Sequence, residues 1–155
     1  MDFLIHSIGV IHSPFRAKEE APMQGALAPE AEGRVEVFPD YAPALQDVEA
    51  FTHLFLLYRF DRAGEIVLVR PTFLDDAPHG VFASRHPCRP NGIGLSVVRL
   101  VRREGSTLIV AGIDILDGTP LLDIKPYIPR FDCHPEAGEG WLAGKGASGK
   151  KPGRE

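Results

Sequence analysis

Short segments rich in branched or aromatic residues, most of them bounded by proline or glycine, run along the 155-residue chain, and in residues 34–38 charged and apolar residues alternate. Alternation with a period of two is typical of half-buried strands, and stretches this short do not make convincing helices. We expect strands over residues 3–12, 34–38, 52–60, 65–70, 95–103, 106–115 and 121–124, with a hairpin connection at 104–106. The sequence therefore predicts an all-β fold with little helix, either a barrel or a sandwich.

The segments between these strands are long and irregular. Residues 16–33 show no periodic pattern and contain two prolines, so we expect an ordered loop, of a length that usually carries function. Residues 41–48 are expected to form a short helix or turn, and residues 74–80 a turn. We predict one domain over residues 1–137 and a C-terminal tail over 138–155. Glycine and lysine dominate the end of this tail, which predicts disorder there, with Trp141 and Leu142 as an apolar anchor.

Composition narrows the class of protein. Hydrophobic residues make up 44% of the chain and charged residues 25%, which is ordinary for a globular domain. The start of the sequence does not read as a signal peptide, and no apolar run is long enough to span a bilayer. Cys88 and Cys133 make no disulfide framework, which fits a reducing compartment. We therefore expect a cytoplasmic protein with no membrane partner.

Charge is distributed unevenly. The whole chain carries a net charge of −4, whereas residues 59–103 hold eight arginines and four acidic residues, a local balance of +4. A basic middle within an acidic chain is compatible with binding a short stretch of phosphate backbone. It is equally compatible with solvated surface arginines.

The segment 84–96 is rich in arginine, proline and glycine. Proline restricts its own backbone and that of the preceding residue, so we expect a stiff, extended loop from Arg85 to Asn91. Asn91 and the glycines at 92 and 94 allow left-handed backbone conformations. Two arginines on a rigid loop suit a carboxylate, a phosphate or a nucleotide edge. The alternative is a proline-rich connection with solvated arginines.

Other familiar motifs are incomplete. Residues 144–150 have the glycine and lysine spacing of a phosphate-binding loop, but Lys151 stands where serine or threonine is needed. Val97 occupies the position of the third glycine in the dinucleotide-binding fingerprint. His86, Cys88, Cys133 and His134 lack the spacing of a zinc-ligand set, so we expect no metal.

Two long motifs resemble those of one family. Residues 85–96 read R-H-P-C-R-P-N-G-I-G-L-S, and residues 114–127 read D-I-L-D-G-T-P-L-L-D-I-K-P-Y. They resemble the signatures R-S-P-x-R-P-N-P-I-G-L-S and D-x-x-D-G-T-P-x-x-D-I-K-P-Y of the TsaA-like, TrmO-type family of S-adenosylmethionine-dependent tRNA methyltransferases. Segments 8–15 and 21–24 match as well, so the resemblance runs from about residue 5 to residue 130. His86 stands where the family usually has serine, and Gly92 where it has proline.

The resemblance implies a single compact β-barrel domain with long irregular loops that binds S-adenosyl-L-methionine. Arg85 or Arg89 can bind the cofactor carboxylate through paired hydrogen bonds, and Asp117 can accept from its ribose or amino group. For Asp117 and Gly118 the alternative is a hairpin turn with no ligand. Leu95 and Leu116 offer apolar walls for adenine. The implied cofactor-binding residues are Pro22, Met23, Gln24, Phe60, Asp61, Arg85, Leu95, Leu116, Asp117, Gly118 and Thr119.

The resemblance also implies a reaction. It is methylation at N6 of N6-threonylcarbamoyladenosine, 3′ of the tRNA anticodon, with the anticodon loop and a homodimer as partners. Arg89 and Asn91 would bind the substrate. As a strand with its exit, residues 123–127 place Asp123, Lys125 and Tyr127 on one face, where they could handle a proton or form a salt-bridged rim without catalytic role.

Two other functions fit the same residues. A module that binds S-adenosylmethionine or a nucleotide without turnover would keep Arg85, Leu95 and residues 117–119 but would need neither Asp123 nor Tyr127. A methyltransferase of the same fold could also act on a different small substrate.

Overall fold

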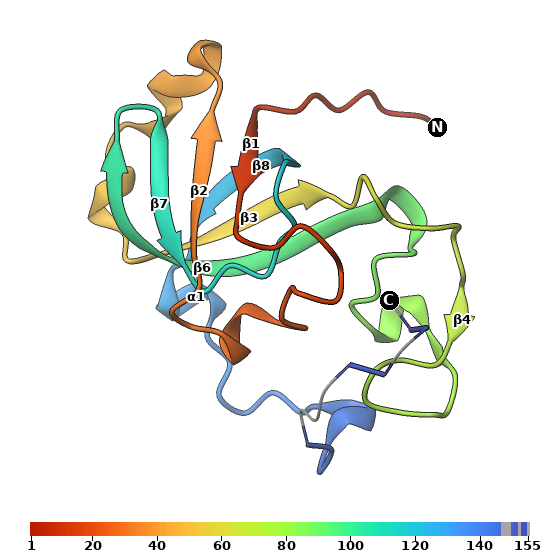
Figure 1. Cartoon of the computed structure of the whole chain (residues 1–155). Helices are drawn as coiled ribbons and strands as arrows, with labels where there is room; N and C mark the ends of the chain where they lie inside the picture. Colours follow the sequence, from red (N-terminus) through yellow and green to blue (C-terminus); the bar gives the residue numbers. More distant parts are fainter. Residues whose placement is uncertain (147–149, 152, 155) are drawn as a thin grey trace.

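Six strands form a closed antiparallel barrel in this computed structural model, which describes residues 1–146, 150–151 and 153–154 (Figure 1). Around the barrel the strands follow the order β1-β2-β7-β6-β3-β8. Their bounds are β1 Gly9–His12, β2 Glu32–Val37, β3 His53–Arg59, β6 Ile93–Glu104, β7 Thr107–Ala111 and β8 Thr119–Pro126. The prediction of an all-β fold is therefore confirmed, and of its two forms the barrel is the one observed.

Every second residue of the strands fills the barrel interior. In β2, exposed charged residues alternate with buried small or apolar ones, and β6 begins with the same alternation. Gly94 lies opposite Tyr58 across the β3–β6 pair, and a Cβ at residue 94 would overlap the Tyr58 ring. Glycine at this position therefore makes room for a large aromatic side chain inside the barrel. The buried core comprises Ile11, Val35, Val37, Leu45, Leu54, Leu56, Tyr58, Val98, Leu108, Val110, Ile113, Ile115 and Leu121.

Helical structure is confined to short turns. The helix or turn expected at 41–48 is formed by two 3-10 helices, η2 (Pro39–Leu45) and η3 (Val48–Ala50), which cover one end of the barrel. The remaining turns are η1 Gly25–Leu27, η4 Val81–Ala83, η5 Pro90–Gly92, α1 Pro129–Asp132 and η6 Gly140–Leu142. No helix among the described residues has the length and apolar character needed to cross a bilayer.

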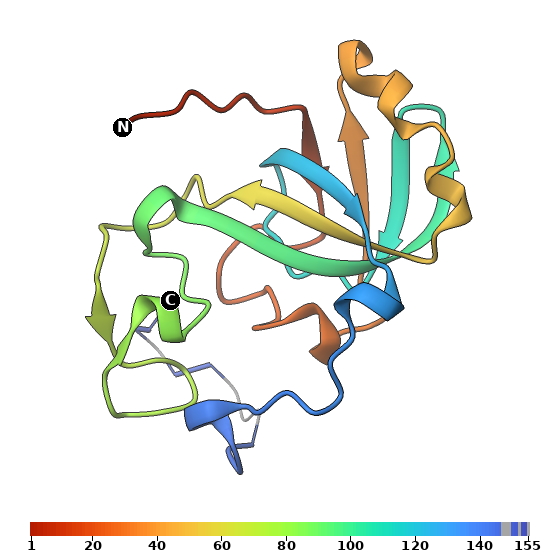
Figure 2. The same cartoon turned by 180° about the vertical axis from the view of Figure 1, so that it is seen from behind.

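The first predicted strand is only partly formed. Residues 3–7 lie outside β1, and the side chains of Phe3, Leu4 and Ile5 are 78%, 84% and 57% exposed. The pairing of β1 with β2 ends where β2 gives way to Pro39, which has no backbone N–H, and to the turns of η2. The N-terminal arm therefore extends away from the barrel (Figures 1 and 2).

The strand predicted over residues 65–70 is mostly absent. Only β4 (Val69–Arg70) forms, and it pairs with β5 (His79–Gly80), which lies in a predicted turn, in a separate two-stranded sheet. A closed barrel has no free edge to which this segment could add. Strand β7 is shorter than predicted because Gly112 takes a φ of 82° and turns the chain away, and β8 is longer than predicted.

Residues 61–92 form a lobe beside the barrel, called here the arginine lobe because it carries Arg85 and Arg89. The C-terminal segment passes below the barrel and ends beside this lobe in both views (Figures 1 and 2). Trp141 stacks on His79 of the lobe, with ring centroids 3.9 Å apart.

Three cations of the C-terminal segment contact acidic residues of the arginine lobe. Lys145 lies 2.7 Å from Asp75, and Lys151 and Arg154 each lie 2.7 Å from Asp76. The division into a domain over 1–137 and a tail over 138–155 stays a prediction, since residues 147–149, 152 and 155 lie outside the described residues.

Candidate functional site

The side chains of Arg85 and Gln24 are in contact, although they belong to different family motifs. The Nη1 of Arg85 donates to Oε1 of Gln24 at 2.6 Å, and Nε2 of Gln24 donates to the carbonyl of Met23 at 2.6 Å. The guanidinium is exposed, and it has five N–H donors in a fixed plane. The contact with Gln24 therefore orients the guanidinium and leaves other donors available for an anion.

A polar network that the sequence analysis did not identify adjoins this pair and consists of the buried Tyr58 and Ser96 and the partly buried Asp114. The hydroxyl of Tyr58 lies 3.1 Å from that of Ser96, which donates to Oδ1 of Asp114, and Oδ2 of Asp114 accepts from the backbone N–H of Gly25 at 2.9 Å. Burial raises the pKa of Asp114, partly offset by its hydrogen bonds and by the charge of Arg85. Burial and the nearby Asp114 likewise raise the pKa of Tyr58, so its hydroxyl stays protonated.

Two residues of this polar network stand in the family motifs. Ser96 is the last residue of the first motif and Asp114 the first residue of the second. Their spacing gives no hint that they meet, because contact requires β6 and the end of β7 to lie together in the barrel.

Thr119 belongs to a second group, with Asp61 and Arg62. The Nη2 of Arg62 donates to Oγ1 of Thr119 at 2.9 Å, and Nε of Arg62 lies 3.3 Å from Oδ1 of Asp61. Phe60 packs edge-on against Tyr58, with ring centroids 5.3 Å apart. This contact brings Phe60 next to the polar network of Tyr58, Ser96 and Asp114. Arg62 was not among the expected site residues, although it directly follows two of them.

Asp117 forms part of a tight turn rather than a free arm. Its Oδ1 accepts from the backbone N–H of Ser13 at 3.1 Å, its backbone N–H donates to the carbonyl of Phe15, and Gly118 has a φ of 79°. The carboxylate also lies 3.6 Å from Nδ1 of His12 and lines an open groove of about 510 Å³. The turn thus fixes residues 116–119 against the end of β1, with one carboxylate oxygen left to accept from a ligand.

The loop from Arg85 to Asn91 is held by hydrogen bonds from arginine side chains to backbone carbonyls. Arg89 donates to the carbonyl of Ser84 at 2.9 Å, and Arg59 donates to the carbonyl of Asn91. Asn91 and Gly92 have φ values of 62° and 54°, in the left-handed region that the sequence suggested. These contacts direct Arg89 into the loop, so of the two arginines Arg85 is the one on the surface.

Asp123, Lys125 and Tyr127 lie on the outer face of the barrel. Strand pairing places Leu95, Leu57 and Asp123 side by side across β6, β3 and β8. A register shift between β3 and β8 at Leu57 adds one residue to β8 and keeps Asp123 facing outwards. Leu95, expected at the cofactor, therefore shares one face with the three expected catalytic residues.

The chemistry available to these three residues is limited by their contacts. Asp123 accepts from the backbone N–H of Ile124 and lies 3.2 Å from Nζ of Lys125, with both side chains largely solvated. The ring of Tyr127 packs against Phe55, with centroids 5.4 Å apart. Desolvation, aided by the nearby thiol of Cys133, raises the pKa of Tyr127. At neutral pH the phenol is therefore a hydrogen-bond donor and not a base.

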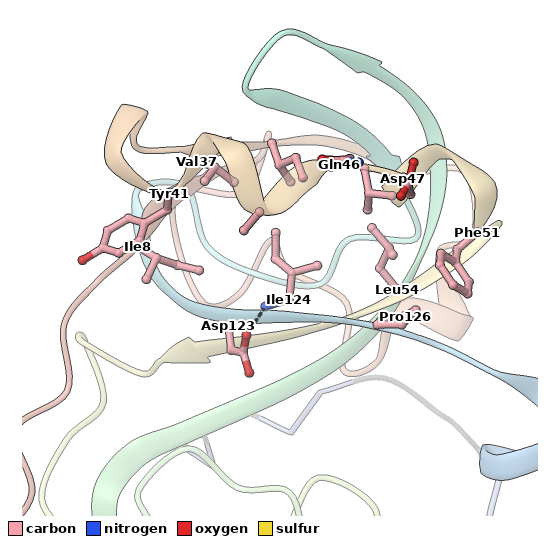
Figure 3. A pocket seen from close by; sticks show the side chains of 13 residues that line it. Ile8, Val37, Tyr41, Gln46, Asp47, Phe51, Leu54, Asp123, Ile124 and Pro126 are labelled. Atoms are coloured by element: carbon pink, nitrogen blue, oxygen red, sulfur yellow. Dashed lines mark hydrogen bonds between the residues drawn. The ribbon is translucent and has the colours of Figure 1, made fainter.

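An apolar cavity of about 320 Å³ opens at the end of the barrel under η2 and η3 (Figure 3). Its walls include Ile8, Leu54 and Ile124, and Asp123 lies at its margin. Neither this cavity nor the groove at Asp117 is lined by Gln24 or Arg85. Of the expected cofactor residues only Asp117 lines either of these two hollows, and all except the buried Thr119 are exposed or partly exposed.

The described residues contain no group of three or more histidine, cysteine or acidic side chains that could hold a metal ion. His86 has other partners: its Nδ1 accepts from the backbone N–H of Cys88 and its Nε2 donates to the carbonyl of Arg154, each at 3.1 Å. Burial lowers the pKa of His86, which favours the neutral ring that both bonds require.

Comparison with known proteins identifies the family. A protein from Pyrococcus abyssi with the name "Probable S-adenosyl-L-methionine-binding protein" is 51% identical over 135 residues, 87% of this chain and 73% of that protein. A human tRNA (adenine(37)-N6)-methyltransferase is 36% identical over 84% of this chain and 31% of its own length.

Solved structures agree with these relatives. The crystal structure of TrmO superposes with a TM-score of 0.80 at 44% identity, covering 90% of this chain and 64% of the TrmO chain. This chain thus spans less than two thirds of the solved protein. Residues 10–133 match the family model described as the tRNA-methyltransferase O N-terminal domain, and the chain therefore belongs to that family.

Proposed function

We propose that this chain is an S-adenosylmethionine-dependent methyltransferase of the cytoplasm that methylates N6-threonylcarbamoyladenosine 3′ of the anticodon in tRNA. The contact between Gln24 and Arg85 is the observation that carries the proposal, because it joins two motifs that the sequence separates by 61 positions. Family membership supplies the reaction class, and the human relative is a tRNA adenine N6-methyltransferase by name.

The cofactor would lie between the barrel and the arginine lobe. The exposed guanidinium of Arg85 would bind the carboxylate of its methionine part, and the free oxygen of Asp117 would accept from its ribose or amino group. Leu95, Leu116 and Phe60 would supply apolar surface for adenine.

Methyl transfer requires no covalent bond between the protein and either reactant. The N6 nitrogen attacks the sulfonium methyl, the S–CH3 bond breaks as the N–CH3 bond forms, and S-adenosylhomocysteine leaves while the N6 proton passes to a base or to water. Holding the two reactants in line and excluding water supplies most of the acceleration for such a reaction. In this proposal Asp123, which pairs with Lys125, accepts the proton, and the protonated Tyr127 donates to the acceptor nucleoside, while Arg89 and Asn91 lie on the substrate side.

A labelled methyl group tests the proposal directly. The purified chain is incubated with S-adenosylmethionine carrying a trideuterated methyl group and with tRNA from a strain that lacks the gene. Mass spectrometry of the nucleosides is expected to find the label on threonylcarbamoyladenosine. Label on another nucleoside would replace the proposed acceptor, and unlabelled tRNA would contradict the methyltransferase assignment.

A binding module without turnover is the second candidate. The name of the Pyrococcus abyssi relative states binding only, and the solvated pair of Asp123 and Lys125 is compatible with a merely structural role. Calorimetric binding of S-adenosylmethionine without label transfer to any tRNA would favour this candidate.

We also propose a homodimer. The arginine lobe exposes a group of large apolar side chains, and contiguous exposed apolar surface marks interaction sites. These side chains are Ile66, Leu68, Val69 and Phe82, with exposures of 60%, 60%, 61% and 80%. A second copy that covers this group would lie next to the proposed cofactor surface.

A further inference from the structure

The carboxylate of Asp114 is partly buried where the chain leaves the barrel after β7, and both of its oxygens accept a hydrogen bond. Oδ1 accepts from the hydroxyl of Ser96 and Oδ2 accepts from the backbone N–H of Gly25. Placing a carboxylate inside a protein is costly unless donors compensate for the lost water. The Asp114 carboxylate is therefore stabilised in this position by the Ser96 hydroxyl and the Gly25 N–H.

Gly25 is fixed from two sides. Asp114 binds its N–H, and a Cβ at residue 25 would overlap the carbonyl oxygen of Gly112, where the chain turns at the end of β7. The long loop is thus pressed against the barrel at Gly25, and a larger residue would push it away. Gln24, the residue before, is held at a defined distance from the barrel wall.

Gln24 in turn orients Arg85. Its Oε1 accepts from Arg85 Nη1, and its Nε2 is anchored on the Met23 carbonyl, so the amide cannot rotate freely. A continuous series of contacts therefore leads from the barrel interior through Asp114, Gly25 and Gln24 to the exposed guanidinium.

We propose that Asp114 is a positioning residue for the cofactor, which sets the loop at Gly25 so that Gln24 can hold Arg85 toward the cofactor carboxylate. This inference rests on the proposed function for its ligand, although the contacts themselves do not. Asp114 would act through Gln24 and would not touch the cofactor.

Two substitutions of Asp114 separate positioning from simple destabilisation. In Asp114→Asn the amide oxygen can accept from Gly25 while the amide NH2 donates to Ser96, whose hydroxyl can then donate to Tyr58. This variant is expected to bind S-adenosylmethionine within about threefold of wild type. Asp114→Leu leaves the N–H of Gly25 without an acceptor and is expected to weaken binding about tenfold or more, which is the size of one lost hydrogen bond to a charged group.

A double-mutant cycle tests the route through Gln24. If Asp114 acts through Gln24, then Asp114→Leu in a Gln24→Ala background should weaken the affinity for S-adenosylmethionine by less than about threefold. Under saturating cofactor, kcat should stay near wild type while KM for S-adenosylmethionine rises. Additive losses in the cycle, or a loss in Asp114→Asn equal to that in Asp114→Leu, would overturn the proposal.

Hydrogen exchange on the free protein provides a measurement that needs no ligand. Asp114→Leu is expected to speed amide exchange in the peptide that spans residues 22–27, while the β2 and β7 peptides stay protected and report an intact barrel. Gln24→Ala and Asp114→Asn should leave that peptide nearly unchanged. If wild type failed to bind S-adenosylmethionine, the proposed function would fall, whereas unchanged exchange in Asp114→Leu would overturn the positioning role alone.

Discussion

Arg85 is the residue at which recognition of an anion would be concentrated. It stands on the surface, one of its donors is committed to Gln24, and Arg89 is turned into its own loop by Ser84. A lysine at this position could not replace it, because an ammonium group cannot bond Gln24 and bind a carboxylate through two parallel hydrogen bonds at the same time.

Replacing this side chain should affect binding more than folding. Arg85→Ala is expected to weaken S-adenosylmethionine binding about ten- to a hundredfold, which corresponds to roughly 1.5–3 kcal/mol for a hydrogen bond between charged groups. Isothermal titration calorimetry measures it, with Arg130→Ala as the control because Arg130 is an exposed arginine of α1. Equal affinities for Arg85→Ala and wild type would remove Arg85 from the cofactor site.

The sequence indicated candidate site residues mainly where a motif places them in a loop. Arg85 and Gln24 were expected at the site because both stand in family motifs, and their contact is consistent with one site. Asp114 and Ser96 were missed because they come into contact only when distant strands pair in the barrel. Asp123 was placed on its face by alternation, but the extra residue in β8 that keeps it there is a property of the pairing.

At the scale of elements, the contact between the C-terminal segment and the arginine lobe depends on charge. Lys145 and His79 both bind Asp75, and the pKa of Asp75 is lowered first by Lys145, then by the backbone of Ala77 and by His79. Lys151, followed by Arg154, lowers the pKa of Asp76. A carboxyl with a lowered pKa stabilises the docked segment above its ordinary pKa of about 4 and loses that contribution as the pH falls below it.

Acid should therefore release the C-terminal segment while the barrel is still folded. Trp141 is the one tryptophan in the sequence and stacks on His79, so its fluorescence reports docking. As the pH is lowered from 7 to about 2, its emission is expected to change below about pH 4, before the far-ultraviolet circular dichroism of the barrel does. Asp75→Asn should show the changed emission already at pH 7. Constant emission over this range in wild type would mean that the ion pairs do not hold the segment.

Element boundaries were predicted best inside the barrel and worst outside it. Segments 34–38, 52–60 and 95–103 became β2, β3 and β6 because neighbours on both sides satisfy their backbone groups. The segment 65–70 is also rich in branched apolar residues, but it pairs with no strand of the barrel and forms only β4. The local sequence pattern indicates which segments favour a strand conformation. Which of them form strands depends on whether a neighbouring strand is available for pairing in the closed barrel.

At the scale of the whole molecule, the arginine lobe carries both the proposed cofactor arginine and four large exposed apolar residues, Ile66, Leu68, Val69 and Phe82. Its backbone is tied to itself, since Val67 donates to Cys88 and Val81 donates to Leu68. These contacts fix Leu68 on the surface without covering its side chain, which is 60% exposed. A twofold contact through such a surface would set the position of the cofactor surface in each copy.

A charge in this surface should separate the copies. In a twofold interface each substitution occurs twice, so Leu68→Asp places two carboxylates in an apolar contact. Light scattering at micromolar concentration is expected to give twice the 17.0 kDa chain mass for wild type and a single chain mass for Leu68→Asp. Phe131→Asp is the matched control, since Phe131 is also 60% exposed but lies in α1. A monomer for wild type at all concentrations would contradict the dimer.

The closure of the barrel has a consequence for synthesis. Strand β1 is the first to leave the ribosome, but one of its two partners is β8. Gly9 can pair with Leu121 only after more than a hundred further residues have been synthesised. At about 5–20 residues per second, β1 spends on the order of ten seconds with one edge unpaired. Pairings between such distant segments also form slowly once the chain is complete. The nascent chain is therefore an expected client of ribosome-associated chaperones, and a chain cut before residue 119 would keep an open, aggregation-prone edge.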